Sequence, residues 1–193
     1  MIKKQNYLKH AIVLFLLLLL MQPERALAAY ENIEFCSLTN HDGLTNSQVG
    51  AILKDTRGYI WFGTQSGLCR FDGFRMKTFY YSNTDDKSLP NNSVDELQQD
   101  YDGNIWVHTS VGYSIYKYDE EQFDRKPEEL LKDIHVQGPP YKLLIDKDKN
   151  MWIAVYGQGL YYHNAKTRNT YLFKFTKKAQ PGCLKEGNIS KIT

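Results

Sequence analysis

The sequence predicts an all-β protein built from four-stranded β-propeller blades, here an incomplete N-terminal portion with three blades and the start of a fourth. Three observations lead to this fold class. A stretch of about 20 residues occurs three times at nearly equal spacing. Every tryptophan of the chain stands at the same place in that stretch. Each copy also consists of short, aromatic and β-branched segments separated by turn residues, which is typical of strands.

The repeat is marked by an aspartate and a tryptophan that are six residues apart. Its copies are "VGAILKDTRGYIWFGTQSGL" from Val49, "VDELQQDYDGNIWVHTSVGY" from Val94 and "PYKLLIDKDKNMWIAVYGQGL" from Pro140, at spacings of 45 and 46 residues. The residues that define the repeat are Asp55, Gly58, Trp61, Asp100, Gly103, Trp106, Asp146 and Trp152. We expect blades at about residues 44–88, 89–135 and 136–183, with the start of the next at 184–193.

The first copy shows how one repeat makes four strands. Val49–Lys54 and Tyr59–Thr64 flank the turn Asp55–Gly58, and Leu68–Phe71 and Arg75–Tyr80 complete an antiparallel meander. Aspartate at the first turn position can accept backbone hydrogen bonds, and glycine at the fourth tolerates a positive φ. Four strands that recur at this spacing indicate a propeller blade. Between the second and third copies, "KPEELLKD" (126–133) predicts a solvated helix.

We interpret the tryptophans as structural residues. A blade must pack against its neighbours, and a large flat side chain can fill the wedge between two sheets. A row of tryptophans can also bind sugars. One tryptophan per repeat, placed between apolar neighbours, favours the core instead.

The first 28 residues have the pattern of a secretory signal peptide. A basic start precedes the uncharged run Ala11–Met21, and Ala26–Ala29 is a small-residue cleavage pattern. The run has 11 residues, well below the roughly 18 that are needed to span a bilayer. We expect cleavage after Ala28, a mature chain of residues 29–193, and a periplasmic location.

Charge and cysteine content exclude several classes of protein. Removing residues 1–28 turns the net charge from +2 into −1, so the mature chain has no basic stripe for nucleic acid. Cys36, Cys69 and Cys183 match no zinc spacing, and their odd number leaves at least one unpaired. Their pairing stays open.

Signs of catalysis or metal binding are scarce. The four mature histidines have no metal-ligand spacing, and no cofactor motif occurs, so we expect no catalytic residue, metal or cofactor. "DKDKNMWI" (146–153) resembles the start of an EF-hand loop. An EF-hand needs glycine at the sixth position and glutamate at the twelfth, where this chain has Met151 and Gly157. We therefore interpret the stretch as a turn in which Asn150 supplies the left-handed residue.

Two segments resemble the two-component regulator propeller repeat. They are "GLTNSQVGAILKDTRGYIWFGTQSGLCRFDGF" (43–74) and "SLPNNSVDELQQDYDGNIWVHTSVGYSIYKYD" (88–119), preceded by the similar lead-in "IEFCSLTNHDGLTN" (33–46). The resemblance implies the periplasmic sensor region of a hybrid two-component regulator, many of which are associated with sensing oligosaccharides. It also implies further blades, a membrane anchor in the inner membrane, a histidine kinase, and a homodimer of the full-length protein.

By analogy with other propellers, a ligand would bind where the connections between blades and the second-to-third strand turns meet. Amides near tyrosine could hydrogen-bond and stack on a sugar there. The candidate ligand-binding residues are Gln65, Ser66, Asn91, Asn92, Tyr156 and Gln158, with Ser110 and Val111 on the same face. Ordinary turn chemistry is the alternative explanation of these residues.

The sequence thus favours a non-catalytic sensor segment, truncated from a longer regulator, with an oligosaccharide as its expected ligand. A secreted propeller lectin or a fragment of a polysaccharide-degrading enzyme is the alternative function. A gene fragment without function is a third possibility.

Overall fold

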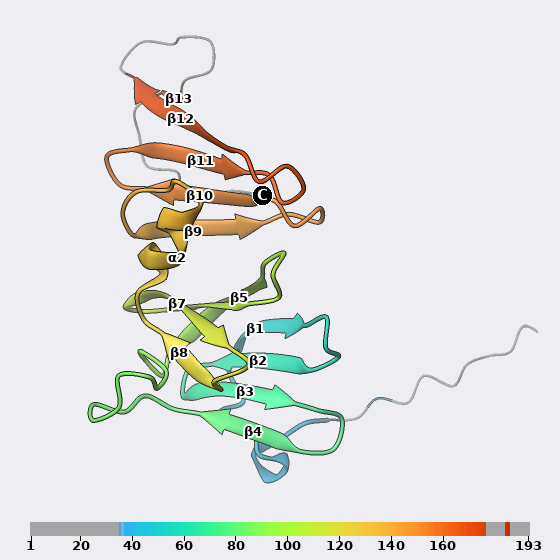
Figure 1. Ribbon diagram of the computed structural model, residues 1–193. Coiled ribbons are helices and arrows are strands. Elements are labelled where there is room, and N and C mark those ends of the chain that lie inside the picture. The colour runs from blue at the N-terminus through green and yellow to red at the C-terminus, as the bar shows by residue number, and fades with distance from the viewer. Residues whose placement is uncertain (1–34, 36, 177–183, 186–193) are drawn as a thin grey trace, which may run out of the picture. The chain divides into compact units, whose positions relative to one another are not determined.

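The structure is a computed structural model that describes residues 35, 37–176 and 184–185 (Figure 1). The chain divides into two compact units, Met1–Cys36 and Ser37–Thr193, and the sheets belong to the second. The predicted signal peptide (1–28), Cys36 and Cys183 lie outside the described residues. Cys69 is a free, buried cysteine.

Three antiparallel sheets follow one another along the chain, and their strands are neighbours in sequence order. Blade one consists of β1 (Val49–Lys54), β2 (Ile60–Thr64), β3 (Gly67–Phe71) and β4 (Met76–Phe79). Blade two consists of β5 (Val94–Gln99), β6 (Ile105–Thr109), β7 (Gly112–Lys117) and β8 (Gln122–Asp124). Blade three consists of β9 (Pro140–Ile145), β10 (Met151–Val155), β11 (Gly159–His163) and β12 (Thr170–Thr176). The predicted fold class, a partial propeller of four-stranded blades, is confirmed.

A short strand lies where the sequence predicts the next repeat to begin. β13 (Leu184–Lys185) pairs in parallel with β12, so that Phe175 lies opposite Leu184. The same parallel bridge joins Tyr81 to Leu89, just before blade two. Tyr81 lies two residues after Phe79, which pairs with Leu68 in blade one. Phe175 likewise lies two residues after Phe173, which pairs with Leu160 in blade three. The chain therefore leaves blade three in the same way as it leaves blade one.

The apolar core lies between the blades. Trp61 is fully buried, and its ring lies 5.8 Å from Phe79 of its own blade and 5.0 Å from Tyr116 of blade two. Trp106 belongs to a second cluster, which includes Leu143 and Ile153 of blade three. Burial of these side chains between neighbouring sheets supplies the main driving force for their packing.

The first hairpin turn of each blade is built around its aspartate. In blade two, Asp100 Oδ1 accepts hydrogen bonds from the backbone N–H groups of Asp102 and Asn104, at 3.0 and 2.9 Å. Its Oδ2 accepts from Asn104 Nδ2 and from Trp106 Nε1, at 3.0 and 2.9 Å. The carboxylate therefore holds the turn and the buried indole together.

The turn of blade three differs from its sequence-based prediction. The left-handed residue is Lys149, with φ of 65°, so the prediction that Asn150 has this role is wrong. Asn150 instead donates its amide to Asp146 Oδ2 at 3.0 Å, and its Oδ1 accepts from the Ala165 backbone N–H at 3.0 Å. The left-handed position is thus the fourth of the turn, as it is for Gly58 with φ of 92°.

The segment between blades two and three forms the predicted helix, but the helix is not simply solvated. α2 (Pro127–Asp133) buries Pro127 and Leu131. Leu131 is fully buried in the cluster that contains Trp106 and Leu143. α2 therefore packs on the junction of the two blades.

Blade two contains a buried hydroxyl without a partner. In blade one, the backbone N–H of Thr45 donates to Cys69 Sγ at 3.4 Å, and the Thr45 hydroxyl lies 3.3 Å from the same sulfur. Pro90 and Ser114 occupy the equivalent positions in blade two. Proline offers neither an N–H nor a hydroxyl, and Ser114 Oγ has no hydrogen-bonding partner among the described residues.

We predict that Ser114→Ala stabilises the protein, because it removes a buried unpaired hydroxyl. The free energy of unfolding in urea should rise by about 1 kcal/mol. Ser88→Ala is the control, since Ser88 Oγ accepts from Arg125 and donates to Asp85 O; it should lower stability by about 1 kcal/mol. If both substitutions lowered the free energy of unfolding by the same amount, the prediction would be wrong.

We predict that Asp100→Asn destabilises the protein by about 2–4 kcal/mol, because an amide nitrogen would face the two donors that Oδ2 now accepts from. Asp102→Asn is the matched control. Asp102 lies in the same turn, and its side chain forms an exposed ion pair with Arg168 at 3.1 Å, so the loss of this charge should cost less than about 1 kcal/mol. Urea unfolding measures both; a cost of Asp100→Asn no larger than that of Asp102→Asn would refute the prediction.

We predict that stability falls as the pH drops below about 6.5, because His163 is fully buried. Its Nδ1 lies 2.8 Å from Thr170 Oγ1, and its ring faces Tyr101 at 5.4 Å. Burial and then the nearby Arg168 lower the pKa of His163, with Asp102 opposing them. The unfolded chain therefore takes up a proton at a higher pH than the folded chain does, and acidification favours unfolding.

The measurement is the free energy of unfolding between about pH 7.5 and about pH 5.5, above the range in which carboxylates titrate. His163→Phe should remove most of the loss of stability. His108→Gln is the control and should keep the loss, because His108 lies in blade two beside Asp95 and is not part of the buried contact of His163 with Thr170 and Tyr101. If the stability of the wild type did not fall over this pH range, the attribution of acid sensitivity to His163 would be wrong.

Candidate functional site

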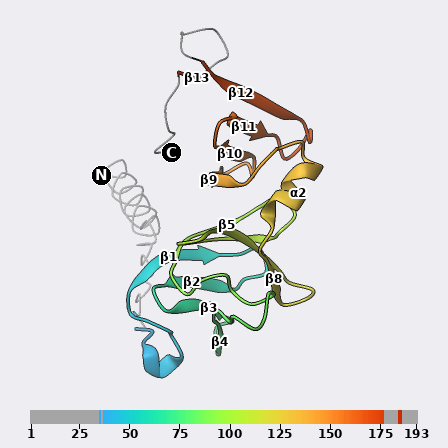
Figure 2. The same cartoon turned by 90° about the vertical axis from the view of Figure 1, so that its left-hand side faces the viewer.

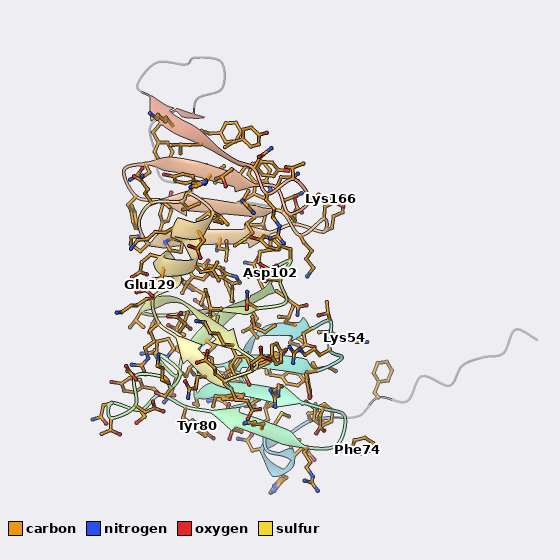
Figure 3. All side chains as sticks on the ribbon, viewed as in Figure 1. Lys54, Phe74, Tyr80, Asp102, Glu129 and Lys166 are labelled. Carbon is orange, nitrogen blue, oxygen red and sulfur yellow. The ribbon has the colours of Figure 1, made fainter. Side chains whose placement is uncertain are left out.

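The connections between blades lie at one end of the strands. This end, at the left in Figure 1, carries the β2–β3, β6–β7 and β10–β11 turns, the segment between β4 and β5, and α2. Figure 2 faces it and shows α2 between the second and third sheets. Lys54, Asp102 and Lys166 mark the opposite end in Figure 3, whereas Glu129 on α2 lies at the connection end.

A hollow of about 490 Å³ opens at the connection end between blades two and three. Its size falls in the range of roughly 300–1,000 Å³ that is usual for ligand pockets. It is lined by His108, Ser110, Val111, Gly112, Tyr113, Arg125, Pro127, Glu128, Pro139, Pro140, Tyr141 and Tyr156.

Two stacked tyrosines form one wall of the hollow. The rings of Tyr141 and Tyr156 lie 4.1 Å apart at an angle of 26°. Tyr156 is nevertheless 67% exposed, and Val111 on the β6–β7 turn is 66% exposed. Exposed aromatic and apolar side chains beside a hollow offer a surface on which a flat ligand ring can stack.

Tyr113, which lines the hollow, belongs to a hydrogen-bond network that joins blades two and three. Tyr113 is buried; its hydroxyl donates to Glu96 Oε2 at 3.0 Å and accepts from the Leu143 backbone N–H at 3.0 Å. Lys142 Nζ donates to the other oxygen of Glu96. Burial and then the charge of Glu96 raise the pKa of Tyr113 above its ordinary value. The phenol therefore stays protonated and fixes the two blades relative to each other.

The other polar side chains of the hollow differ in the hydrogen bonds and ion pairs that they form with described residues. His108 Nδ1 lies 2.6 Å from Asp95 Oδ1, and its ring packs on Tyr113 at 4.4 Å. The guanidinium of Arg125 donates to the segment before blade two, including Ser88 Oγ at 2.7 Å. The side chain of Glu128 forms no hydrogen bond or ion pair with any residue that the structure describes.

Four of the predicted residues, Gln65, Ser66, Asn91 and Asn92, do not line this hollow. Gln65 Oε1 accepts from Ser93 Oγ at 2.9 Å, and Asn91 Oδ1 accepts from the Ser93 backbone N–H at 2.8 Å. Ser66 Oγ accepts from Asn46 at 2.9 Å, and Asn92 Oδ1 accepts from the backbone N–H of Tyr81 at 2.7 Å. These side chains hold turns and join the two blades.

The predicted residues of blade three are divided between two hollows. Tyr156 lines the hollow beside α2 together with Ser110 and Val111. Gln158 lines a different hollow of about 330 Å³ on blade three, and its Oε1 accepts from Tyr161 OH at 3.1 Å.

Sequence reasoning did not find His108, Glu128 and Tyr141 as site residues. None of them occupies a position that the repeat marks. The available signal was the helical segment 126–133 with the following Pro139-Pro140, because it occurs only between the second and third copies.

The described ranges contain no group of three or more His, Cys, Asp or Glu residues that could hold a metal ion. The two carboxylate oxygens of Asp146 accept from Asp148 N, Asn150 N and Trp152 Nε1, which is the pattern of the repeat turn. None of the helices in the described part of the chain is long and apolar enough to cross a membrane.

Comparison with known proteins identifies the repeat. The family model described as "Two component regulator propeller" matches residues 43–66 and 88–110. These ranges contain the first hairpins of blades one and two with the segments that lead into them. Two-component regulator propeller repeats are therefore present in this chain.

Similar proteins include Histidine kinase P4 from Formosa agariphila, which is 41% identical over 61 residues, or 32% of this chain and 4% of that protein. The extracellular domain assigned to the hybrid two component system BT3049 from B. thetaiotaomicron is 24% identical, with a TM-score of 0.51 over 72% of this chain and 20% of that one. The corresponding domain of BT4673 is 18% identical, with a TM-score of 0.40 over 72% of this chain and 27% of that one. The chain thus spans a small part of each relative, and the likeness to BT3049 supports the fold.

Proposed function

We propose that this chain, which carries two-component regulator propeller repeats, is a ligand-binding segment of an extracytoplasmic sensor in a hybrid two-component regulator. In this proposal residues 1–28 export the chain to the periplasm. The segment binds an oligosaccharide and performs no catalysis, and the signal passes to further blades and signalling domains of a dimeric, membrane-anchored regulator. The matched repeats and the extracellular location of the BT3049 domain support this proposal.

The observation that carries ligand binding is the exposed face of Tyr156 beside the hollow. The apolar face of a sugar ring can stack on an aromatic ring, and Tyr156 is held in place by its own stack on Tyr141. Sugar hydroxyls need donors and acceptors nearby, which Ser110, His108 and Glu128 supply.

The position of the hollow suits a sensor, because its walls come from two blades. Ser110 and Val111 belong to blade two, whereas Tyr141 and Tyr156 belong to blade three. A ligand that contacts both walls favours the arrangement of blades in which both contacts are made. Binding energy can therefore bias how this junction is packed.

We predict that Tyr156→Ala weakens oligosaccharide binding about tenfold or more, which corresponds to roughly 1.4 kcal/mol of lost stacking. The full chain would be tested by isothermal titration calorimetry against hexasaccharides of glucose, galactose, mannose, xylose and arabinose. Tyr171→Ala is the matched control, because Tyr171 is a 53% exposed tyrosine of the same blade that lies outside the hollow's lining.

Tyr171→Ala should bind like the wild type. An absence of binding to every hexasaccharide, or equal losses in the two variants, would remove the hollow as the oligosaccharide site.

A further inference from the structure

Two charged side chains that line the hollow, Arg125 and Glu128, form no ion pair with any residue that the structure describes. Arg125 donates to backbone carbonyls of residues 82, 85, 88 and 89, and His108 lies beside Asp95. Glu96, which accepts from Tyr113, is paired with Lys142. Glu128 alone among the lining carboxylates and cations has no hydrogen bond or ion pair within the described ranges.

The rotation of α2 places Glu128 at the hollow. Leu131 and Pro127 are buried, and they fix which side of the short helix faces the blades. Glu128 lies three residues before Leu131, so it projects from nearly the same side of the helix. Glu129 lies a further 100° or so around the helix; it is exposed and lies 4.0 Å from Lys126 Nζ.

An unpaired carboxylate at the edge of an aromatic hollow discriminates between ligands by charge. It accepts hydrogen bonds from two neighbouring hydroxyls of an uncharged sugar, because each of its oxygens has acceptor capacity. It repels the negative charge of a uronate carboxylate or of a sulfate ester, and the repulsion is stronger in a partly enclosed site than in water. The cation of the same lining, Arg125, has its Nε and Nη2 groups directed at backbone carbonyls of the segment before blade two.

We propose that the hollow is a subsite for an uncharged glycosyl residue, and that Glu128 is the specificity-determining residue that excludes uronate and sulfated sugars. The inference rests on the proposed oligosaccharide-binding function. In the complex, Tyr156 stacks on the ring, and Glu128 accepts from hydroxyls at the ring's edge.

The test compares each hexasaccharide of glucose, galactose and mannose with the same compound oxidised at C6, which replaces CH₂OH by a carboxylate. Calorimetry with the full chain should give at least about tenfold tighter binding of the uncharged form. Glu128→Gln should reduce this preference severalfold, mainly through tighter binding of the oxidised form.

Glu129→Gln is the matched control. Both glutamates lie in the first turn of α2, so both substitutions remove the same favourable interaction with the helix N-terminus. Glu129→Gln should keep the wild-type preference. If Glu129→Gln reduced the preference for the uncharged hexasaccharide as much as Glu128→Gln does, Glu128 would not be the specificity-determining residue.

The remaining outcomes separate this inference from the function on which it rests. If oxidised and uncharged forms bind equally well and Tyr156→Ala weakens both, the charge selectivity is wrong and the oligosaccharide site stands. If no compound binds in a way that depends on Tyr156, the proposed function fails, and the assignment of Glu128 fails with it.

Discussion

The hydrogen bond between the repeat aspartate and the repeat tryptophan is the interaction on which the other contacts between blades depend. Trp61 Nε1 donates to Asp55 Oδ2 at 2.6 Å, and the same bond recurs in blades two and three. Asp55 Oδ1 meanwhile accepts from the backbone N–H groups of Arg57 and Tyr59. One carboxylate thus closes the hairpin and satisfies the polar atom of an indole that is buried between two sheets. A buried aspartate is tolerated here because every donor around it points at its oxygens.

Further polar contacts, some of them to the same aspartate and its turn, hold each blade against the next. Tyr118 of blade two donates to Asp55, and Gln99 accepts from the Thr56 backbone N–H at 3.0 Å. At the next junction, the amide of Gln98 donates to Leu143 O at 2.8 Å and accepts from Ile145 N at 2.5 Å, so a side chain extends the hydrogen bonding of β9. These contacts hold blades two and three at a set separation. The hollow needs that separation, because its walls belong to different blades.

The sequence predicts the features whose residues recur in each repeat, and it misses the features whose residues do not recur. Asp55 and Trp61 recur with fixed spacing, so the strands and the first hairpin turns follow from periodicity and turn chemistry. The left-handed conformation of Lys149 did not follow, because asparagine is the residue that usually tolerates it and Asn150 stood next to it. The burial of Leu131 and the approach of Tyr141 to Tyr156 depend on tertiary packing, which no local pattern reports.

The candidate site lies where the blades differ from one another. The segment before blade two is held as a loop by Asn92 and Ser88, which bond the backbone N–H groups of Tyr81 and Ser82. The segment before blade three instead forms α2, whose Leu131 enters the core between the blades. Because an apolar side chain fixes the rotation of the helix, Glu128, three residues before Leu131, is directed to the junction although its side chain has no hydrogen bond or ion pair with a described residue. A repeated scaffold supplies rigid walls, and a single non-repeated segment supplies the side chain that can distinguish one ligand from another.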